Sequence, residues 1–306
     1  MDSRSSPTYF RRFWTRRFAR IFPVYFLMIG LYLLAANVQI VYPTLLGSQL
    51  TSSGVPLGPY LIFTQNIYMA LFEDTGASML GVTWSLAIEE HFYVVFPLLY
   101  LALLRLPRRV QGGVLASVCL GVLAWRCVLV FGFAADSDRT YFATDTRLDA
   151  LLVGCLLAVV ANPALDRVSF GTGRSLGVLL TGGVLVVVGE QIPERLVSTV
   201  GQTVQSIGLL LAFAAILAAP QTFVGRLLEW APLARLGVLS YSFYLFHGVV
   251  LSAVQENSDW GIAPTAALAF AVTLALSQAV HVLVERPLAR VRRRLTHQQP
   301  PPAALV

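Results

Sequence analysis

The sequence predicts an all-α protein, a polytopic bundle of about eight transmembrane helices with both termini in the cytoplasm. Of its 306 residues, 56% are hydrophobic and only 12% are charged, whereas soluble proteins carry about 25% charged residues. The apolar residues gather in runs close to the roughly 20 residues that a membrane-spanning helix needs. No polar linker divides the chain, so the sequence predicts one transmembrane domain.

The spans follow from these runs and from the charges between them. The apolar runs lie at about 21–40, 83–104, 112–134, 145–161, 175–190, 203–219, 237–255 and 264–284. With the N-terminus inside, 18 of the 22 arginines fall in cytoplasmic segments, as the positive-inside rule expects. Counting 57–72 as a further span would scramble this pattern. We therefore expect this short run, which contains Gln65 and Asn66, to lie in an outer loop or to re-enter the membrane.

Composition also bounds the partners and cofactors. The net charge of +6 comes from arginine alone, since the chain contains no lysine, and in a membrane protein such a balance records topology rather than nucleic-acid binding. Cys119, Cys127 and Cys155 show neither metal-site spacing nor a disulfide framework. We expect no bound metal or cofactor, a transmembrane domain over 1–290, and a basic, Pro-rich disordered tail over 291–306.

Ionisable side chains at membrane depth are the candidate functional residues, because each costs about 2.5–3.5 kcal/mol there. In TWSLAIEEHFYVVFP, Ser85, Glu89 and Tyr93 share one helix face. Glu90 lies about 100° around the helix, and His91 lies nearly opposite. We expect Glu89 to face the bundle interior and His91 to lie at a helix interface. The alternative is an ionic cluster at the outer membrane interface.

A second polar stripe occurs in LSYSFYLFHGVV. Ser240, Tyr244 and His247 follow one another at i, i+4 and i+7, with His247 close to mid-membrane. Histidine is a general base at neutral pH, but a lone histidine in a helix is often simply hydrogen-bonded. Both interpretations stay open for His247.

Arg126 lies inside the third predicted span and needs an acidic partner or water. The candidate partners are Glu89, Glu90 and Asp149. Asp149 begins the fourth span on the same face as Asp145, where ordinary ion pairing at a helix end is also expected.

The first and last spans carry further charges at their predicted cytoplasmic ends. Arg16, Arg17 and Arg20 precede the first apolar run, where they serve topology and attract anionic lipid at about 1 kcal/mol each. Alternatively, their guanidinium groups bind phosphates of a donor such as coenzyme A. His281 and Glu285 form an i, i+4 pair in the last span, which an interfacial ion pair would explain.

Together, these stretches resemble the acyltransferase-3 family of membrane O-acyltransferases, which modify lipopolysaccharide, peptidoglycan, exopolysaccharides and antibiotics. The matching stretches, in the family's order, are RRFARIFPVY (16–25), TWSLAIEEHFYVVFP (83–97), RLDALLVG (147–154), LSYSFYLFHGVVL (239–251) and VERPL (284–288). The resemblance covers nearly the whole chain.

The resemblance implies transfer of an acyl group, often acetyl, from acyl-CoA as co-substrate to a hydroxyl of a sugar or similar acceptor. It places Arg16, Arg17 and Arg20 at the cytoplasmic mouth near the donor, Glu89, Tyr244 and His247 along the cavity, and Glu285 with Arg286 at its cytoplasmic end. Adding the polar residues found from helix spacing, we expect catalytic Glu89, Tyr244 and His247, donor-binding Arg16, Arg17 and Arg20, and the cavity residues Ser85, Tyr93, Arg126, Asp149, Ser240, Glu285 and Arg286.

One feature departs from the family. Its members begin with two further spans, and the first of these carries an arginine followed about ten residues later by the histidine proposed as catalytic base. None of His91, His247, His281 or His297 matches that motif. We expect an N-terminally truncated domain, either because Met1 is not the true start or because the product is inactive or needs a partner chain for the missing helices. If the base must come from this chain, His247 is the fallback, because it is the only histidine at a suitable depth in the membrane.

Two other classes of function stay open. A transporter or flippase of a lipid-linked sugar would use Glu89, Arg126 and His247 to relay protons or to hold a head group. A non-catalytic remnant would act as a scaffold. In each case we expect a multi-pass protein of the bacterial cell membrane. For the acyltransferase, the expected partners are the bilayer, acyl-CoA and a glycan or other hydroxyl acceptor.

Overall fold

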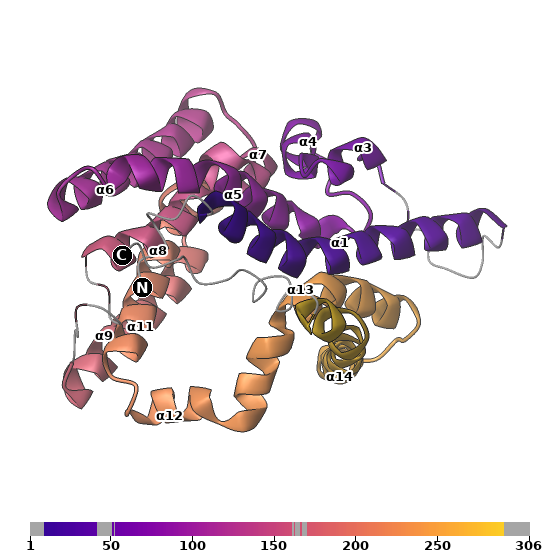
Figure 1. Cartoon of the computed structure of the whole chain (residues 1–306). Helices are drawn as coiled ribbons and strands as arrows, with labels where there is room; N and C mark the ends of the chain where they lie inside the picture. The colour runs from indigo at the N-terminus through magenta and orange to yellow at the C-terminus, as the bar shows by residue number, and fades with distance from the viewer. Residues whose placement is uncertain are drawn as a thin grey trace, which may run out of the picture. The chain divides into compact units, whose positions relative to one another are not determined.

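The computed structural model describes residues 9–41, 51, 53–160, 162, 166 and 170–290, and every regular element within these ranges is a helix (Figure 1). This confirms the all-α prediction. The predicted tail, 291–306, lies outside the described residues.

Seven helical segments within these ranges are long and apolar enough to cross a membrane. They are Phe13–Ile40, Gly81–Leu103, Arg108–Gly132, Thr172–Gln191, Glu194–Ala218, Ala231–Glu256 and Ile262–Arg290. They coincide with seven of the eight predicted spans. The remaining predicted span, the fourth in the chain (145–161), coincides with α8 (Leu148–Val160), which has only 13 residues. This helix is about 20 Å long, shorter than a hydrocarbon core of about 30 Å.

The short run 57–72 forms two helices, α3 (Leu57–Leu61) and α4 (Gln65–Phe72). Neither is long enough to cross a membrane, as predicted. The two amide side chains of this run, Gln65 and Asn66, are fully buried. Asn66 donates to the carbonyl of Phe142 (3.1 Å) and to the hydroxyl of Thr144 (2.9 Å). These bonds account for Asn66 within an apolar segment, because they tie the segment to the chain that precedes α8.

The chain forms two compact units. The first contains α1 (Tyr9–Val41), the segment Thr75–Thr83 and, from Arg235 onward, most of α13 (Ala231–Glu256), α14 (Ile262–Val280) and the π-helical turn η6 (His281–Glu285). The second contains Val55–Asp74 and Trp84–Ala234, with the helices α5 (Trp84–Leu103), α6 (Arg108–Cys127), α7 (Ser137–Phe142), α8, α9 (Thr172–Gln191), α11 (Gln202–Ala218) and α12 (Phe223–Glu229). Short turns complete the second unit: η3 (Val128–Gly132), η4 (Thr144–Thr146), α10 (Glu194–Leu196) and η5 (Val197–Gly201).

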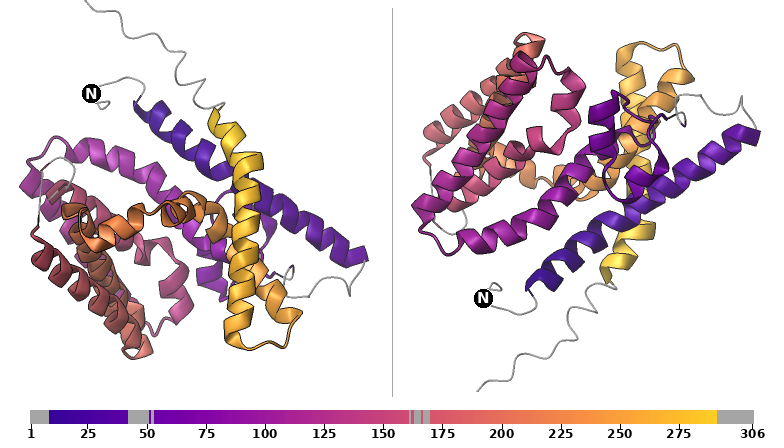
Figure 2. Two further views of the ribbon diagram at one scale, coloured as in Figure 1. Left: turned by 90° about the horizontal axis from the view of Figure 1, so that it is seen from below. Right: turned by 90° about the horizontal axis from the view of Figure 1, so that it is seen from above.

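Side-chain hydrogen bonds to distant partners join the helices of the first unit. The Tyr241 hydroxyl on α13 donates to the carbonyl of Ile21 on α1 at 2.7 Å. Arg235, also on α13, donates to the Gln278 amide oxygen on α14 at 2.6 Å. Figure 2 shows α1 (indigo) and α14 (yellow) crossing beside α13. A polar face of α13 therefore fixes both neighbouring helices of this unit.

In the second unit, α8 runs antiparallel to α6. Near the C-terminal end of α6, Arg126 pairs with Asp149 at the start of α8. At the opposite end, Arg108 makes a two-pronged contact with Asp166, at 3.0 and 2.8 Å. The hydrogen bond from Arg108 lowers the pKa of the Asp166 carboxyl below its usual value. The two pairs thus mark the two ends of the same helix.

Glycine permits a close helix contact in the second unit, between α9 and α11. A Cβ added at Gly182 would lie 2.5 Å from the carbonyl oxygen of Gly208, and one at Gly208 would lie 2.6 Å from the carbonyl oxygen of Gly182. Such small-residue interfaces bring helix backbones together in membranes, where no hydrophobic effect drives association. A Cβ added at Gly183, the next residue, would meet no heavy atom within 4 Å.

Gly182→Ala therefore lowers the thermal stability of the protein, because the added methyl group forces α9 and α11 apart at a cost of about 1–3 kcal/mol. The matched control is Gly183→Ala, which adds the same methyl group to open space and leaves the melting temperature unchanged or higher, since alanine favours helix over glycine. Thermal unfolding of both variants in one detergent measures the difference. Equal melting temperatures would contradict the close packing.

Candidate active site

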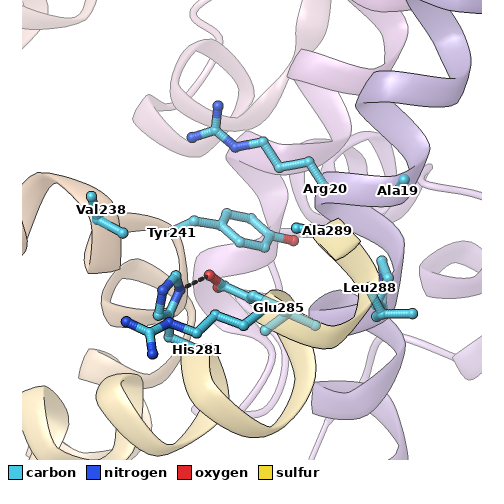
Figure 3. A pocket seen from close by; sticks show the side chains of 11 residues that line it. Ala19, Arg20, Val238, Tyr241, His281, Glu285, Leu288 and Ala289 are labelled. Atoms are coloured by element: carbon cyan, nitrogen blue, oxygen red, sulfur yellow. Dashed lines mark hydrogen bonds and ion pairs between the residues drawn. The ribbon is translucent and has the colours of Figure 1, made fainter. Parts of the chain in front are cut away.

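A cavity of about 460 Å³ lies in the first unit between α1, α13 and the end of α14 (Figure 3). Pockets that bind small molecules occupy about 300–1,000 Å³. The lining residues are Ala19, Arg20, Pro23, Val24, Val238, Tyr241, His281, Glu285, Arg286, Leu288 and Ala289. The cavity is the place where the first and last long helices bring charged side chains together.

Interrupted helix geometry shapes two walls of this cavity. On α1, Pro23 lacks the N–H group that would bond the carbonyl of Ala19 one turn earlier. On the opposite wall, His281–Glu285 forms a π-helical turn, in which the N–H of Arg286 bonds to the His281 carbonyl. Proline follows directly at position 287. π-Helical turns occur frequently at functional sites.

A chain of hydrogen bonds links three side chains at the cavity. Nδ1 of His281 lies 2.6 Å from Oε2 of Glu285, and the Ser242 hydroxyl donates to Oε1 of the same carboxylate at 2.5 Å. Because an ionised carboxylate only accepts hydrogen bonds, Nδ1 of His281 carries a proton. In the neutral imidazole, Nε2 then keeps its lone pair. Ser242 is fully buried, so the pair is held from the protein interior.

Two guanidinium groups line the same cavity. Figure 3 shows Arg20 on the α1 wall, across Tyr241 from the His281–Glu285 pair, and Arg286 follows Glu285 directly in the chain. Guanidinium groups bind phosphate oxygens in a forked geometry. The structure places Arg20, Glu285 and Arg286 of the predicted set together. Arg16 and Arg17 are not among the residues that line this cavity.

The stripe on α13 lies on a different hollow of the first unit, about 530 Å³ in volume and mostly apolar. Ser240, Tyr244 and His247 line it together, as their spacing predicts. The Tyr244 hydroxyl donates to the carbonyl of Val82 at 2.9 Å, and Nδ1 of His247 lies 2.6 Å from the carbonyl oxygen of Tyr244. His247 is therefore oriented by a neutral backbone group, not by a carboxylate.

The residues predicted on the segment 83–97 belong to α5 of the second unit. The Tyr93 hydroxyl donates to Oε2 of Glu89 at 3.2 Å, so these two side chains share a face as predicted. Ser85 is half-buried on the same helix. The more deeply buried carboxylate is the neighbouring Glu90, which is 5% exposed. Nδ1 of His91 lies 2.7 Å from the Thr144 hydroxyl, which confirms its predicted place at a helix interface.

Arg126 and Asp149 form a fully buried ion pair, 2.7 Å between Nη2 and Oδ2. Of the three candidate partners for Arg126, the structure selects Asp149. Gln202 and Thr203 on α11 and the carbonyl of Thr146 also accept hydrogen bonds from this guanidinium. The pair therefore joins α6, α8 and α11 at one point in the core.

Asp145 has partners of its own, although it shares a predicted face with Asp149. Its carboxylate accepts from Arg139 at 2.6 Å and from the Trp125 indole at 2.8 Å. Partial burial raises the pKa of Asp145, but the hydrogen bonds from Arg139 and Trp125 outweigh it and leave the pKa below its usual value. This partly exposed pair is the expected ion pair near a helix end.

Two residues of this site were missed by sequence reasoning. Tyr241 and Ser242 stand beside the stripe that the spacing singled out, but they face other neighbours. The i, i+4 spacing of His281 and Glu285 was visible, yet an interfacial ion pair explained it equally well. Nothing in the sequence indicates that Ser242, some forty positions earlier, completes the group.

The seven long apolar helices indicate a multi-pass membrane protein. Its first unit contains a cavity in which the His281 imidazole lies beside two guanidinium groups. The chain belongs to the acyltransferase-3 family, whose model, described as an acyltransferase domain, matches residues 3–282. This confirms the predicted resemblance.

Among its relatives is YrhL of Bacillus subtilis (strain 168), 29% identical over 91% of this chain and 45% of the relative. O-acetyltransferase OatA of Staphylococcus aureus (strain NCTC 8325 / PS 47) is 27% identical over 82% of this chain and 42% of its own length. Peptidoglycan O-acetyltransferase OatA of Listeria monocytogenes (strain EGD-e) is 27% identical over 91% and 46%, respectively. The chain thus spans less than half the length of these relatives. No solved structure matches it.

Removing one partner of the buried pair is expected to destabilise the second unit strongly. Asp149→Asn leaves the Arg126 charge buried without its counter-ion, at a cost of about 3–5 kcal/mol. The double variant Arg126→Met/Asp149→Leu is expected to lose much less, because no charge is left unpaired. Denaturant unfolding in micelles measures both.

The control for this comparison is Arg139→Gln, which removes the partly exposed pair with Asp145. Its expected cost is about 1 kcal/mol or less. Similar losses for Asp149→Asn and Arg139→Gln would contradict the central role of the buried pair.

Proposed function

We propose that this protein is a membrane-bound O-acyltransferase that moves an acyl group, acetyl in the simplest case, from a cytoplasmic acyl-CoA to a hydroxyl of a cell-envelope glycan. Family membership supports the reaction class. The names of the Staphylococcus and Listeria relatives support acetyl as the group transferred, and the Listeria name supports peptidoglycan as the glycan.

The observation that carries this proposal is the cavity of the first unit, where Arg20, Arg286 and His281 line one space. Coenzyme A is a phosphorylated anion, and forked guanidinium groups are suited to its phosphates. The cavity thus offers an anion-binding wall to a phosphorylated donor.

The proposal includes eight crossings, with both termini on the cytoplasmic face of a bacterial cell membrane. The distribution of arginines supports this orientation. The eighth crossing is supported by two contacts with α6: Asp149, at the start of α8, pairs with Arg126, and Asp166 pairs with Arg108, so the contacts span the distance from Arg126 to Arg108. That distance is about 27 Å along the helix axis, close to the thickness of a hydrocarbon core.

The remaining predicted residues are proposed to serve the acceptor. Glu89, held by the Tyr93 hydroxyl, and the stripe of Ser240, Tyr244 and His247 are polar groups at membrane depth, where their cost favours a functional use. They are proposed to line the route by which the acceptor hydroxyl reaches the bound donor.

Arg20→Gln is expected to weaken the binding of coenzyme A about tenfold or more, because it removes a charge-assisted hydrogen bond worth at least about 1.5 kcal/mol. The matched control is Arg109→Gln, which removes one exposed arginine of the second unit. Isothermal titration of coenzyme A into the protein in lipid nanodiscs measures the Kd of each.

Equal Kd values for the two variants would contradict the assignment of the donor site. A wild-type protein that transports a lipid-linked sugar without consuming acetyl-CoA would instead favour the transporter.

A further inference from the structure

We propose that a cavity of the second unit binds sugar hydroxyls of the acceptor glycan on the outer side of the membrane. The inference rests on the proposed function, because it locates the acceptor of the same reaction. The cavity has a volume of about 430 Å³, within the range of pockets that hold small molecules. Its polar lining residues are Asp136, Ser137, Glu194, Arg195 and Ser198, and Phe131 supplies an aromatic ring.

The cavity lies one turn beyond the buried ion pair of this unit. Past Arg126, α6 continues into the π-helical turn η3, which contributes Phe131 to the lining. The π-helical turn η5 ends directly before Gln202, the α11 partner of Arg126, and contributes Ser198. Because Arg108, at the other end of α6, faces the cytoplasm in the proposed topology, the cavity opens on the side where a cell-envelope glycan lies.

Irregular backbone forms the walls of this cavity. Both η3 and η5 are π-helical, and such turns occur frequently at functional sites. Between η3 and α7, the lining residue Ala134 has a φ of 52°, in the left-handed region that is uncommon for residues other than glycine. Such conformations persist where the surrounding structure holds them, often at ligand sites. Three departures from regular helix geometry thus converge on one cavity.

The polar side chains of the cavity keep hydrogen-bonding capacity for a ligand. Ser198 is only 8% exposed, yet its hydroxyl forms no hydrogen bond with a described residue. The neighbouring Thr199 hydroxyl instead donates to the carbonyl of Arg195 at 2.9 Å, as hydroxyls within helices commonly do. Within the described ranges, the Arg195 guanidinium and the Glu194 carboxylate also form neither an ion pair nor a hydrogen bond. Since buried polar groups normally have partners, the Ser198 hydroxyl points to a ligand.

This combination of groups fits a hydroxyl-rich ligand. The Asp136 carboxylate caps α7 by accepting from the N–H of Asp138, which fixes its position. Carboxylates accept hydrogen bonds from hydroxyls, the Arg195 guanidinium donates to them, and the Ser198 hydroxyl does both. The ring of Phe131, which is 56% exposed, offers an apolar face to the C–H groups of a sugar. Two carboxylates against one guanidinium disfavour a phosphorylated ligand such as the donor.

The first experiment measures the Kd of a soluble peptidoglycan disaccharide for the intact protein in nanodiscs, by ligand-detected NMR. Arg195→Gln is expected to raise this Kd about tenfold or more, because it removes a charged donor. Ser198→Ala is expected to raise it about threefold to tenfold, because it removes a neutral hydroxyl. The matched controls are Arg109→Gln and Ser206→Ala, in the same unit but outside this cavity, and they leave the Kd unchanged.

The Kd of coenzyme A is expected to stay unchanged in all four variants. Equal disaccharide Kd values for the cavity variants and their controls would overturn the proposal. A wild-type protein that does not bind the disaccharide would also overturn it.

A labelling experiment tests the same cavity without relying on affinity. Ser137 is an exposed lining residue, so Ser137→Cys is expected to react with a membrane-impermeant maleimide in intact cells, against the wild-type background. Saturating disaccharide is expected to slow this reaction several-fold. Labelling that requires an opened membrane, or that the disaccharide does not slow, would contradict the assignment.

Turnover separates this inference from the proposed function. With acetyl-CoA and the disaccharide, Arg195→Gln is expected to raise the KM for the disaccharide about tenfold or more while kcat stays unchanged. Disaccharide binding without acetyl transfer would count against the proposed function and leave the binding cavity in place. Acetyl transfer with a KM that neither Arg195→Gln nor Ser198→Ala changes would support the function and overturn the inference.

Discussion

The buried ion pair of Arg126 and Asp149 is the interaction on which the second unit depends. A fully buried guanidinium in a chain this apolar needs partners within the protein, and here the carboxylate, an amide, a hydroxyl and a backbone carbonyl bind its two terminal nitrogens. Because these partners come from α8, from α11 and from the turn before α8, satisfying one charge fixes three helices together. The close glycine contact of α9 with α11 then brings a fourth helix into the same unit.

The first unit uses its charges in the opposite way. Arg20 and Arg286 line a cavity rather than a packed core, and the carboxylate of Glu285 is committed to His281 and Ser242. The charge of Arg126 inside the second unit is thus neutralised by the protein, whereas Arg20 and Arg286 line the cavity of the first unit, where they are proposed to bind the donor. This contrast separates residues that hold the fold from residues that serve the proposed acyl transfer.

Two helix interruptions lie at the cavity of the first unit. Pro23 opens one turn of α1 at the cavity, and the π-helical turn of His281–Glu285 widens the last helix just before Pro287. In the sequence, Pro23 stands within the first apolar run, and Pro287 follows shortly after the last one. Their effect on side-chain direction is not visible there, because it depends on which neighbouring helix each turn faces.

The composition and the spacing of apolar residues were enough to predict the helical class and seven of the eight long spans. The helical period was enough to predict that Glu89 shares a face with Tyr93 and Ser240 with His247, since these follow from local geometry along one helix. Motifs in their order were enough for the family. The partner of Arg126, chosen from three acids, and the union of Ser242, Glu285 and Arg20 around one cavity emerged from packing between helices far apart in sequence. A charge buried away from water must be met by whichever groups the fold brings within about 3 Å, and spacing along a single helix carries no information about that choice.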